Sequence, residues 1–248
     1  MATRLAKVIQ NIVHESQKCV PGRRIIENIH LVQDLIDAIV KGDFAAAFIL
    51  LDQEKAFDRI SHKFMIKTLR TFGFGENFIK WVEIIYRDVN SRVKVNGFLT
   101  EEIKINRGVR QGCALSALLY VLCAEVLTTN IRKNKLIKGF SFENDDYEHK
   151  DATYADDMNI CVTTDESITE LFKTLDKYEQ ATNSKINRDK TVCQWLGAWK
   201  NRTDKPLGLN WTSNAVMFLG VYIGNDRKEA STATFSDIND SIKGEISY

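Results

Sequence analysis

The chain has 248 residues, of which 44% are hydrophobic and 27% charged, the composition of an ordinary globular protein with one large core or two small ones. The formal net charge is +1, so no global basic field attracts nucleic acid, and such a partner would need a local groove. The five cysteines form no C-x-x-C pair, which argues against a zinc or disulfide framework and favours reduced thiols in an intracellular protein.

The first fifty residues predict two helices and a buried strand. Apolar residues at helical spacing predict a helix over 4–16 and, after the break at "PGRR" (21–24), a second helix from Ile25. The N-terminus has no long apolar stretch, so neither a signal peptide nor a membrane span is predicted, and no membrane partner is expected. The apolar run "AAFILLD" (46–52) predicts a strand that ends in a carboxylate, Asp52.

The rest of the chain mixes helices with hairpins. Asn96-Gly97, within the alternating stretch 92–105, predicts a hairpin, and a second one is predicted where the acidic stretch 143–151 leads into "ATYADDMNICV". Ser167 and Glu170 are spaced as a capping box. Periodic apolar residues predict further helices in 61–75, 77–89, 116–133, 165–182 and from 234, and strands in 190–197 and 215–224. Prominent hairpins among helices favour an α+β fold with an antiparallel sheet.

Two neighbouring aspartates, Asp156 and Asp157, interrupt the second predicted hairpin. Like charges this close repel, and burial strengthens the repulsion, so a cation is expected beside them. If this hairpin lies next to the strand that ends at Asp52, three carboxylates converge. Carboxylates without histidine or cysteine suit Mg²⁺ or Mn²⁺, and two such ions about 3.5–4 Å apart serve phosphoryl transfer. The alternative is a solvated turn and an ordinary strand-end cap.

A glycine-punctuated loop, "RGVRQG" (107–112), precedes the long apolar helix. Its backbone N–H groups can face a phosphate or a base pair, and Gln111 offers both a donor and an acceptor. The alternative is a tight turn that starts the helix.

These stretches occur together in an order that resembles the reverse transcriptases of non-LTR (LINE-type) retrotransposons, from about residue 3 to residue 225. They are "LDQEKAFDRISHKFMIKTLRTFGF", "NGFLTEEIKINRGVRQGCALSALLYVL", "YADD", "SKINRDKT" and "FLGVYIG". The resemblance implies a polymerase palm, an antiparallel sheet packed on helices, with partial helical fingers and only the start of a thumb. It implies partial fingers in 1–47, palm in 48–225 with a fingers insertion at about 65–110, and the start of a truncated thumb in 226–248.

The resemblance also implies roles for particular residues. Asp52, Asp156 and Asp157 resemble the catalytic metal ligands, with the Gln53 carbonyl facing the second ion. Phe57 resembles the bulky residue that excludes a ribose 2′-OH. Nucleotide and template contacts are expected from Arg110, Gln111, Gly112 and Lys190. For Lys190, which resembles a lysine near the leaving pyrophosphate, the alternative is a solvated lysine at the start of a strand.

By resemblance, then, the chain is an RNA-directed DNA polymerase domain that uses two Mg²⁺ ions (or Mn²⁺), an RNA template, a DNA or RNA primer and dNTPs. An upstream arginine motif, a thumb and other segments of a larger polyprotein are expected outside it. Two alternatives remain: a non-catalytic remnant with weak nucleic-acid binding, and a maturase-like splicing factor, which would carry a basic extension. Neither nucleus nor cytoplasm is favoured by the sequence.

Overall fold

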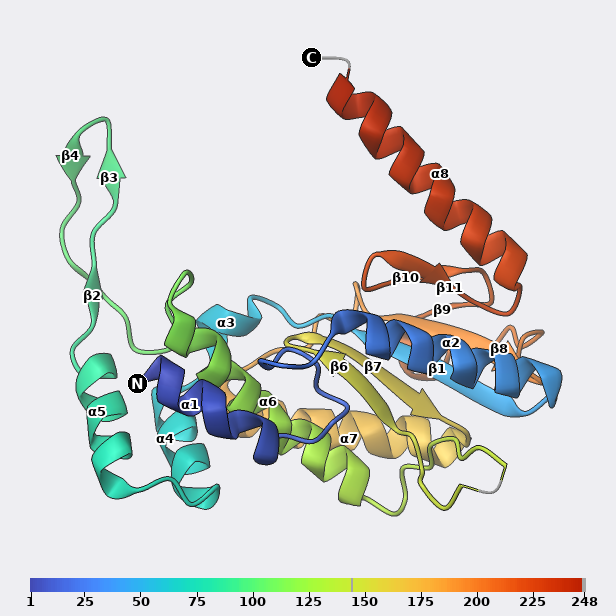
Figure 1. The fold of residues 1–248 in the computed structure, drawn as a ribbon, viewed down its shortest axis with the longest axis horizontal. Helices are drawn as coiled ribbons and strands as arrows, with labels where there is room; N and C mark the ends of the chain where they lie inside the picture. The colour runs from blue at the N-terminus through green and yellow to red at the C-terminus, as the bar shows by residue number, and fades with distance from the viewer. Residues whose placement is uncertain (144, 247–248) are drawn as a thin grey trace.

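A five-stranded sheet with the order β6-β7-β1-β8-β9 forms the centre of the protein (Figure 1). The computed structural model describes residues 1–143 and 145–246, so one residue of the predicted acidic turn and the end of the predicted tail helix lie outside the described residues. The strands are β1 (Ala45–Leu51), β6 (Asp151–Tyr154), β7 (Asp157–Val162), β8 (Val192–Gly197) and β9 (Asn210–Thr212). All neighbours pair antiparallel except β8 and β9, which are parallel. The predicted α+β class with a mainly antiparallel sheet is confirmed.

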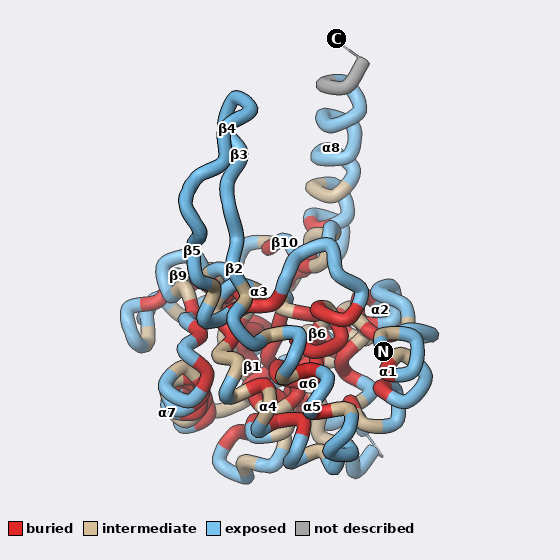
Figure 2. The backbone as a smooth tube through the Cα atoms, turned by 90° about the vertical axis from the view of Figure 1, so that its left-hand side faces the viewer, coloured by how far each residue is buried: buried red, intermediate tan, exposed pale blue. Residues whose placement is uncertain are grey.

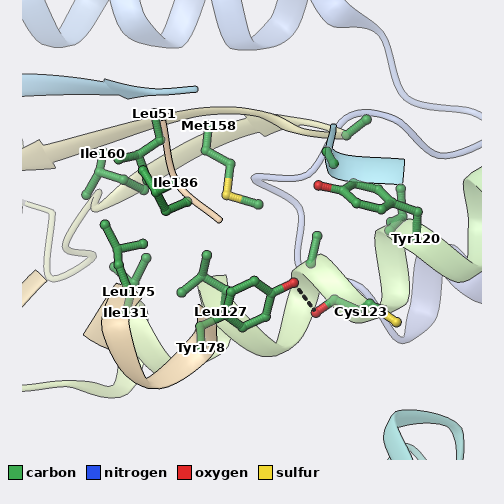
Figure 3. Packing of buried hydrophobic residues seen from close by; sticks show 14 of the residues in the cluster. Leu51, Tyr120, Cys123, Leu127, Ile131, Met158, Ile160, Leu175, Tyr178 and Ile186 are labelled. Atoms are coloured by element: carbon green, nitrogen blue, oxygen red, sulfur yellow. Dashed lines mark hydrogen bonds between the residues drawn. The ribbon is translucent and has the colours of Figure 1, made fainter. Parts of the chain in front are cut away.

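Both faces of the sheet are covered, because successive side chains of a strand point to opposite faces. Ala46 and Phe48 of β1 pack with the apolar stripe of α2 (Ile25–Lys41). Ala47 and Ile49 belong to the larger core on the other face, with α6 (Ala114–Lys133) and α7 (Asp165–Thr182). Figure 3 shows this core, where Leu51 and Met158 of the sheet lie above side chains of α6 and α7.

The helix α6 is apolar on almost every side because it runs through this core. Thirteen of its residues are buried, and its length and composition alone would allow it to cross a membrane. Most of its apolar stretch is buried inside the fold, as in the central helix of a globular protein. The remaining helices around it are α1 (Ala2–Val8), the 3-10 turn η1 (Ile9–Asn11), α4 (His62–Thr71) and α5 (Glu76–Tyr86).

Two segments project from the same side of the body, with the short helix α3 (Ala56–Arg59) between them (Figure 1). One is the long hairpin built from β2 (Asn90–Ser91), β3 (Lys94–Val95), β4 (Phe98–Leu99) and β5 (Ile103–Lys104). The other is α8 (Arg227–Ile246), which follows the small hairpin of β10 (Val216–Phe218) and β11 (Val221–Ile223). Figure 2 shows that both segments are largely exposed.

Three local predictions need correction. The first helix does not reach residue 16, because α1 and η1 end by Asn11 and the chain then turns. The cap of α7 is Thr164, whose hydroxyl accepts from the N–H of Ser167, so the predicted capping box is wrong by one turn. The stretch 215–224 is two strands joined at Leu219-Gly220, both with positive φ, rather than one.

A buried ion network fastens the start of β6 to α6. Arg132 donates to Glu125 and, over 2.9 Å, to the carboxylate of Asp151, and both acidic side chains are almost fully buried. The hydroxyl of Ser16 donates to the same Asp151 carboxylate over 2.6 Å. The segment after η1 is thereby fixed beside the edge strand β6.

Candidate active site

Three aspartates lie where β1 ends and the β6–β7 hairpin turns. Leu51 pairs with Met158, so the next position along the same register sets Asp52 across from Asp157. Asp156 occupies the tight turn between Tyr154 and Asp157, which pair with each other. Asp52 and Asp156 are half-buried and Asp157 is exposed. The sheet topology therefore brings together carboxylates that are about a hundred residues apart in the sequence.

These carboxylates affect one another electrostatically. The pKa of Asp156 is raised by loss of hydration and by the charge of Asp52. The pKa of Asp157 is raised mainly by loss of hydration around its carboxyl group. The charges of Asp156 and Asp52 raise it further. None of the ion pairs among the described residues involves these three side chains. The cluster thus carries negative charge that no protein cation neutralises within the described part of the chain.

The side chains of Asp52, Asp156 and Asp157 do not converge on one point at which a metal ion could bind. Over residues 1–143 and 145–246, no group of three histidine, cysteine, aspartate or glutamate side chains is arranged so that it could hold an ion as placed. The donor set is nevertheless oxygen only, which suits Mg²⁺ or Mn²⁺. The role of the three aspartates as metal ligands stays a prediction.

Gln53 directly follows Asp52, and Phe57 lies in α3. The Gln53 side chain is buried, and its Nε2 approaches the Met158 sulfur at 3.5 Å. Two backbone hydrogen bonds lie on either side of Gln53. The Glu54 N–H donates to the Lys185 carbonyl, and the Asn187 N–H donates to the Asp52 carbonyl. The Gln53 carbonyl accepts neither bond.

The half-buried ring of Phe57 stacks on Tyr120 of α6, with ring centroids 4.4 Å apart. Burial raises the pKa of Tyr120 well above its usual value, and the charge of Asp156 contributes to the shift. Phe57 is therefore held in place by contact with a fully buried side chain of α6. In Figure 3 the Tyr120 hydroxyl is directed to the side where Met158 lies.

The loop 107–112 is fastened to the segment that contains Phe57. The N–H groups of Gly108 and Val109 donate to the carbonyls of Ile60 and Phe57, both over 2.7 Å. A Cβ added to Gly108 would lie 2.7 Å from the Asp58 carbonyl oxygen. This close backbone contact sets the loop beside α3.

The three predicted nucleotide or template contacts of this loop, Arg110, Gln111 and Gly112, are exposed. Arg110 and Gln111 line a cavity of about 800 Å³ that extends to Tyr86 and Lys104. None of the three aspartates lines this cavity, so the structure places the loop residues near Phe57 but does not join them to the carboxylates in one pocket.

Lys190 lies in the turn before β8, between two residues whose hydrogen bonds reach the Asp52 backbone, Asn187 and Thr191. Its N–H donates to the side chain of Asn187, and the Asn187 N–H donates to the Asp52 carbonyl over 2.8 Å. Thr191, the next residue, accepts from the Asp52 N–H. The Lys190 side chain is exposed, and its contact with a leaving group stays a prediction.

One residue beside the carboxylates has no signal in the sequence. Gln17 is 1% exposed and hydrogen-bonds to the backbone of Ala155, immediately before Asp156. It follows the end of the first helix, in a stretch without apolar periodicity, and its partner is 138 residues away. Only the three-dimensional structure reveals this contact.

The half-buried Arg23 is hydrogen-bonded to the backbone around Gln17. Its guanidinium donates to four backbone carbonyls, those of Gln10, Val13, His14 and Gln17. It stabilises the loop after η1.

Comparison with known proteins agrees with this architecture. A family model described as reverse transcriptase (RNA-dependent DNA polymerase) matches residues 1–223. The Transposon TX1 uncharacterized 149 kDa protein of Xenopus laevis is 32% identical over 234 residues, which are 93% of this chain and 18% of that protein. The retrovirus-related Pol polyprotein from the type-2 retrotransposable element R2DM of Drosophila melanogaster is 32% identical over 142 residues, 56% of this chain and 13% of that protein. The chain thus spans less than a fifth of the length of these relatives.

Telomerases are among the solved structures that match this fold. The apo telomerase of Candida tropicalis truncated from its C-terminal domain superposes with a TM-score of 0.62 at 13% identity, over 90% of this chain and 43% of that one. Telomerase of Candida albicans, in complex with a TWJ fragment of telomeric RNA, gives a TM-score of 0.59 at 14% identity, over 90% and 35%. At these identities the match shows the fold alone, a polymerase palm. With its sheet, its motifs in order and a family match over most of its length, the chain belongs to the reverse transcriptases, the RNA-dependent DNA polymerases, of the non-LTR (LINE-type) kind.

Proposed function

We propose that the chain carries the catalytic centre of an RNA-directed DNA polymerase, in which Asp52, Asp156 and Asp157 hold two divalent ions. The observation that carries the proposal is the unneutralised carboxylate cluster at the end of β1, formed by strands β1 and β7 in register. Mg²⁺ or Mn²⁺ held by these residues would favour deprotonation of the primer 3′-OH and would neutralise the charge that develops on the leaving oxygen.

The protein side chains around the cluster position the substrates. Phe57, held by its stack on Tyr120, lies beneath the sugar of the incoming dNTP and excludes a 2′-OH by its bulk. The exposed loop with Arg110, Gln111 and Gly112 contacts the nucleotide and the template, and Lys190 provides a positive charge for the pyrophosphate. Positioning and electrostatics account for catalysis in such a centre, without a covalent intermediate on the protein.

The projecting segments suit the partners that this function requires. The β2–β5 hairpin and α8 rise on either side of α3 (Figure 1), and we propose that a template paired with a primer contacts both. We propose the domain division that the family resemblance implies: partial fingers in 1–47, palm in 48–225 with a fingers insertion at about 65–110, and the start of a truncated thumb in 226–248.

Primer extension tests the proposal. We expect the 248-residue chain to add dNTPs to oligo-dT on poly-rA with Mg²⁺ or Mn²⁺, and Asp156→Asn to abolish the addition. Asp34→Asn, on the exposed side of α2, is the matched control and retains activity. Undiminished addition by Asp156→Asn contradicts the site. Salt-sensitive RNA binding without any addition by the unsubstituted chain supports the non-catalytic remnant instead.

Phe57→Ala tests the sugar contact separately. Loss of the ring is expected to raise the rate of rNTP relative to dNTP addition by roughly tenfold or more, the scale on which fit to one small group discriminates. An unchanged ratio removes Phe57 from the nucleotide site and leaves the metal ligands unaffected.

A further inference from the structure

The turn that carries Asp156 has an unfavourable backbone conformation. Ala155 has φ +54°, in the left-handed region, although it has a Cβ atom. The pairs Tyr154–Asp157 and Thr153–Met158 close the hairpin directly around it. Because this turn sets the direction of the two carboxylates that follow, whatever holds it also sets the geometry of the cluster.

The Gln17 side chain contacts both backbone groups of Ala155. Its Oε1 accepts from the Ala155 N–H over 2.9 Å, and its Nε2 approaches the Ala155 carbonyl at 3.4 Å. The same Oε1 accepts from the N–H of Cys19 over 2.9 Å, which fixes the amide. A buried amide that satisfies a buried N–H is costly to remove, since the N–H then has neither water nor another partner.

Gln17 is itself held in place from two directions. Residues 16–18 pair with the free edge of β6: Thr153 N–H donates to the Ser16 carbonyl over 3.0 Å, and Lys18 N–H donates to the Thr153 carbonyl over 2.9 Å. The Arg23 guanidinium donates to the Gln17 carbonyl over 2.8 Å. The amide therefore acts on the turn from a rigid support.

We propose that Gln17 is a positioning residue, which holds the Ala155 turn so that Asp156 and Asp157 face Asp52. It touches none of the reacting groups and acts through the backbone of Ala155. The inference rests on the proposed function, because it assigns Gln17 a role only where the aspartates bind divalent ions. Outer partners of this kind typically change metal affinity by about 10- to 100-fold when they are removed.

The test compares Gln17→Met with Gln194→Met. Methionine keeps the length of glutamine and removes the amide. Gln194 on β8 is 0% exposed and also holds two backbone carbonyls, those of Asn214 and Ile223, but it pairs with Phe48, four residues before Asp52. Three quantities are measured on the 248-residue chain: Mn²⁺ binding by electron paramagnetic resonance, hydrogen exchange of the peptide 152–160, and thermal unfolding.

We expect Gln17→Met to bind Mn²⁺ about 10- to 100-fold more weakly and to exchange faster over 152–160, whereas Gln194→Met changes neither at a similar loss of thermal stability. Equal Mn²⁺ affinity in Gln17→Met and the unsubstituted chain overturns the positioning role and leaves the proposed function intact. If the unsubstituted chain shows no Mn²⁺ binding that Asp156→Asn abolishes, the proposed function and this inference both fail. If Gln17→Met is too unstable to measure, the comparison is made with Gln17→Asn, whose amide is one methylene too short to reach Ala155, with the same outcomes.

Discussion

Two glycines of one loop provide a stability test of how the loop is fastened. Gly108 and Gly112 both have positive φ, +87° and +76°. A Cβ on Gly112 meets nothing within 4 Å, so Gly112→Ala carries only the backbone strain of a positive φ, about 1–2 kcal/mol. A Cβ on Gly108 lies 2.7–2.9 Å from three backbone atoms of Asp58, which cannot turn aside as a side chain does.

Gly108→Ala therefore adds overpacking, about 1–3 kcal/mol, to a similar strain. The expected loss of unfolding free energy is about 2–5 kcal/mol for Gly108→Ala and about 1–2 kcal/mol for Gly112→Ala. Urea unfolding at equilibrium measures both, as a shift of the midpoint at an unchanged slope. Equal losses in the two variants would refute the close packing of the loop on Asp58, and with it the reason for placing Arg110 and Gln111 beside α3.

Other substitutions test the electrostatics and the helix cap. Because the pKa of Asp156 is raised above its ordinary 3.8, the folded protein is destabilised as this group ionises; without added metal, Asp156→Asn should raise the unfolding free energy at pH 7, and the gain should vanish as the pH falls below about 3.8. A gain that persists in acid would point to packing instead. Arg132→Met leaves the buried Glu125 and Asp151 uncompensated and should lower the unfolding free energy by about 3–5 kcal/mol, and a loss under 1 kcal/mol would show that the network is solvated. Thr164→Ala removes the cap of α7 and should lower the unfolding free energy by about 1 kcal/mol in the same urea assay. An unchanged unfolding free energy would show that Thr164 does not cap the helix.

The sequence predicts those parts of the fold whose signals are local. Asn96-Gly97 sits at the tip of a real hairpin with φ of +49° and +89°, and the apolar run before Asp52 is β1. The order of the motifs is enough to identify the family, since each motif keeps its place relative to the others. The convergence of the carboxylates is also predictable, because Asp52 follows one strand and Asp156 lies in the turn of a hairpin, and neighbouring strands bring both to one edge of the sheet.

Features that depend on distant partners are not predictable in this way. The parallel partner β9 is three residues long and has no periodicity of its own. Gln17 follows a helix whose predicted end is too late. Ile12 and Val13 continue the apolar helical spacing, although the helix has already ended at Asn11. The function of Gln17 depends on a backbone turn near residue 155, which no pattern around residue 17 encodes.

The pairing of residues 16–18 with β6 has a consequence for biosynthesis. Ser16 and Gln17 find their partners 135 to 138 positions further along the chain, and Leu5 and Ile9 are buried in the core that includes α6. Contacts separated by so many residues require a long loop to close before they contribute any stabilisation. As the polypeptide leaves the ribosome, residues 1–18 must wait, unpaired, until the β6–β7 hairpin has emerged. This segment, synthesised before the hairpin, is therefore among the last to settle, and a chaperone that shields its apolar residues during that interval should raise the yield of correctly folded protein.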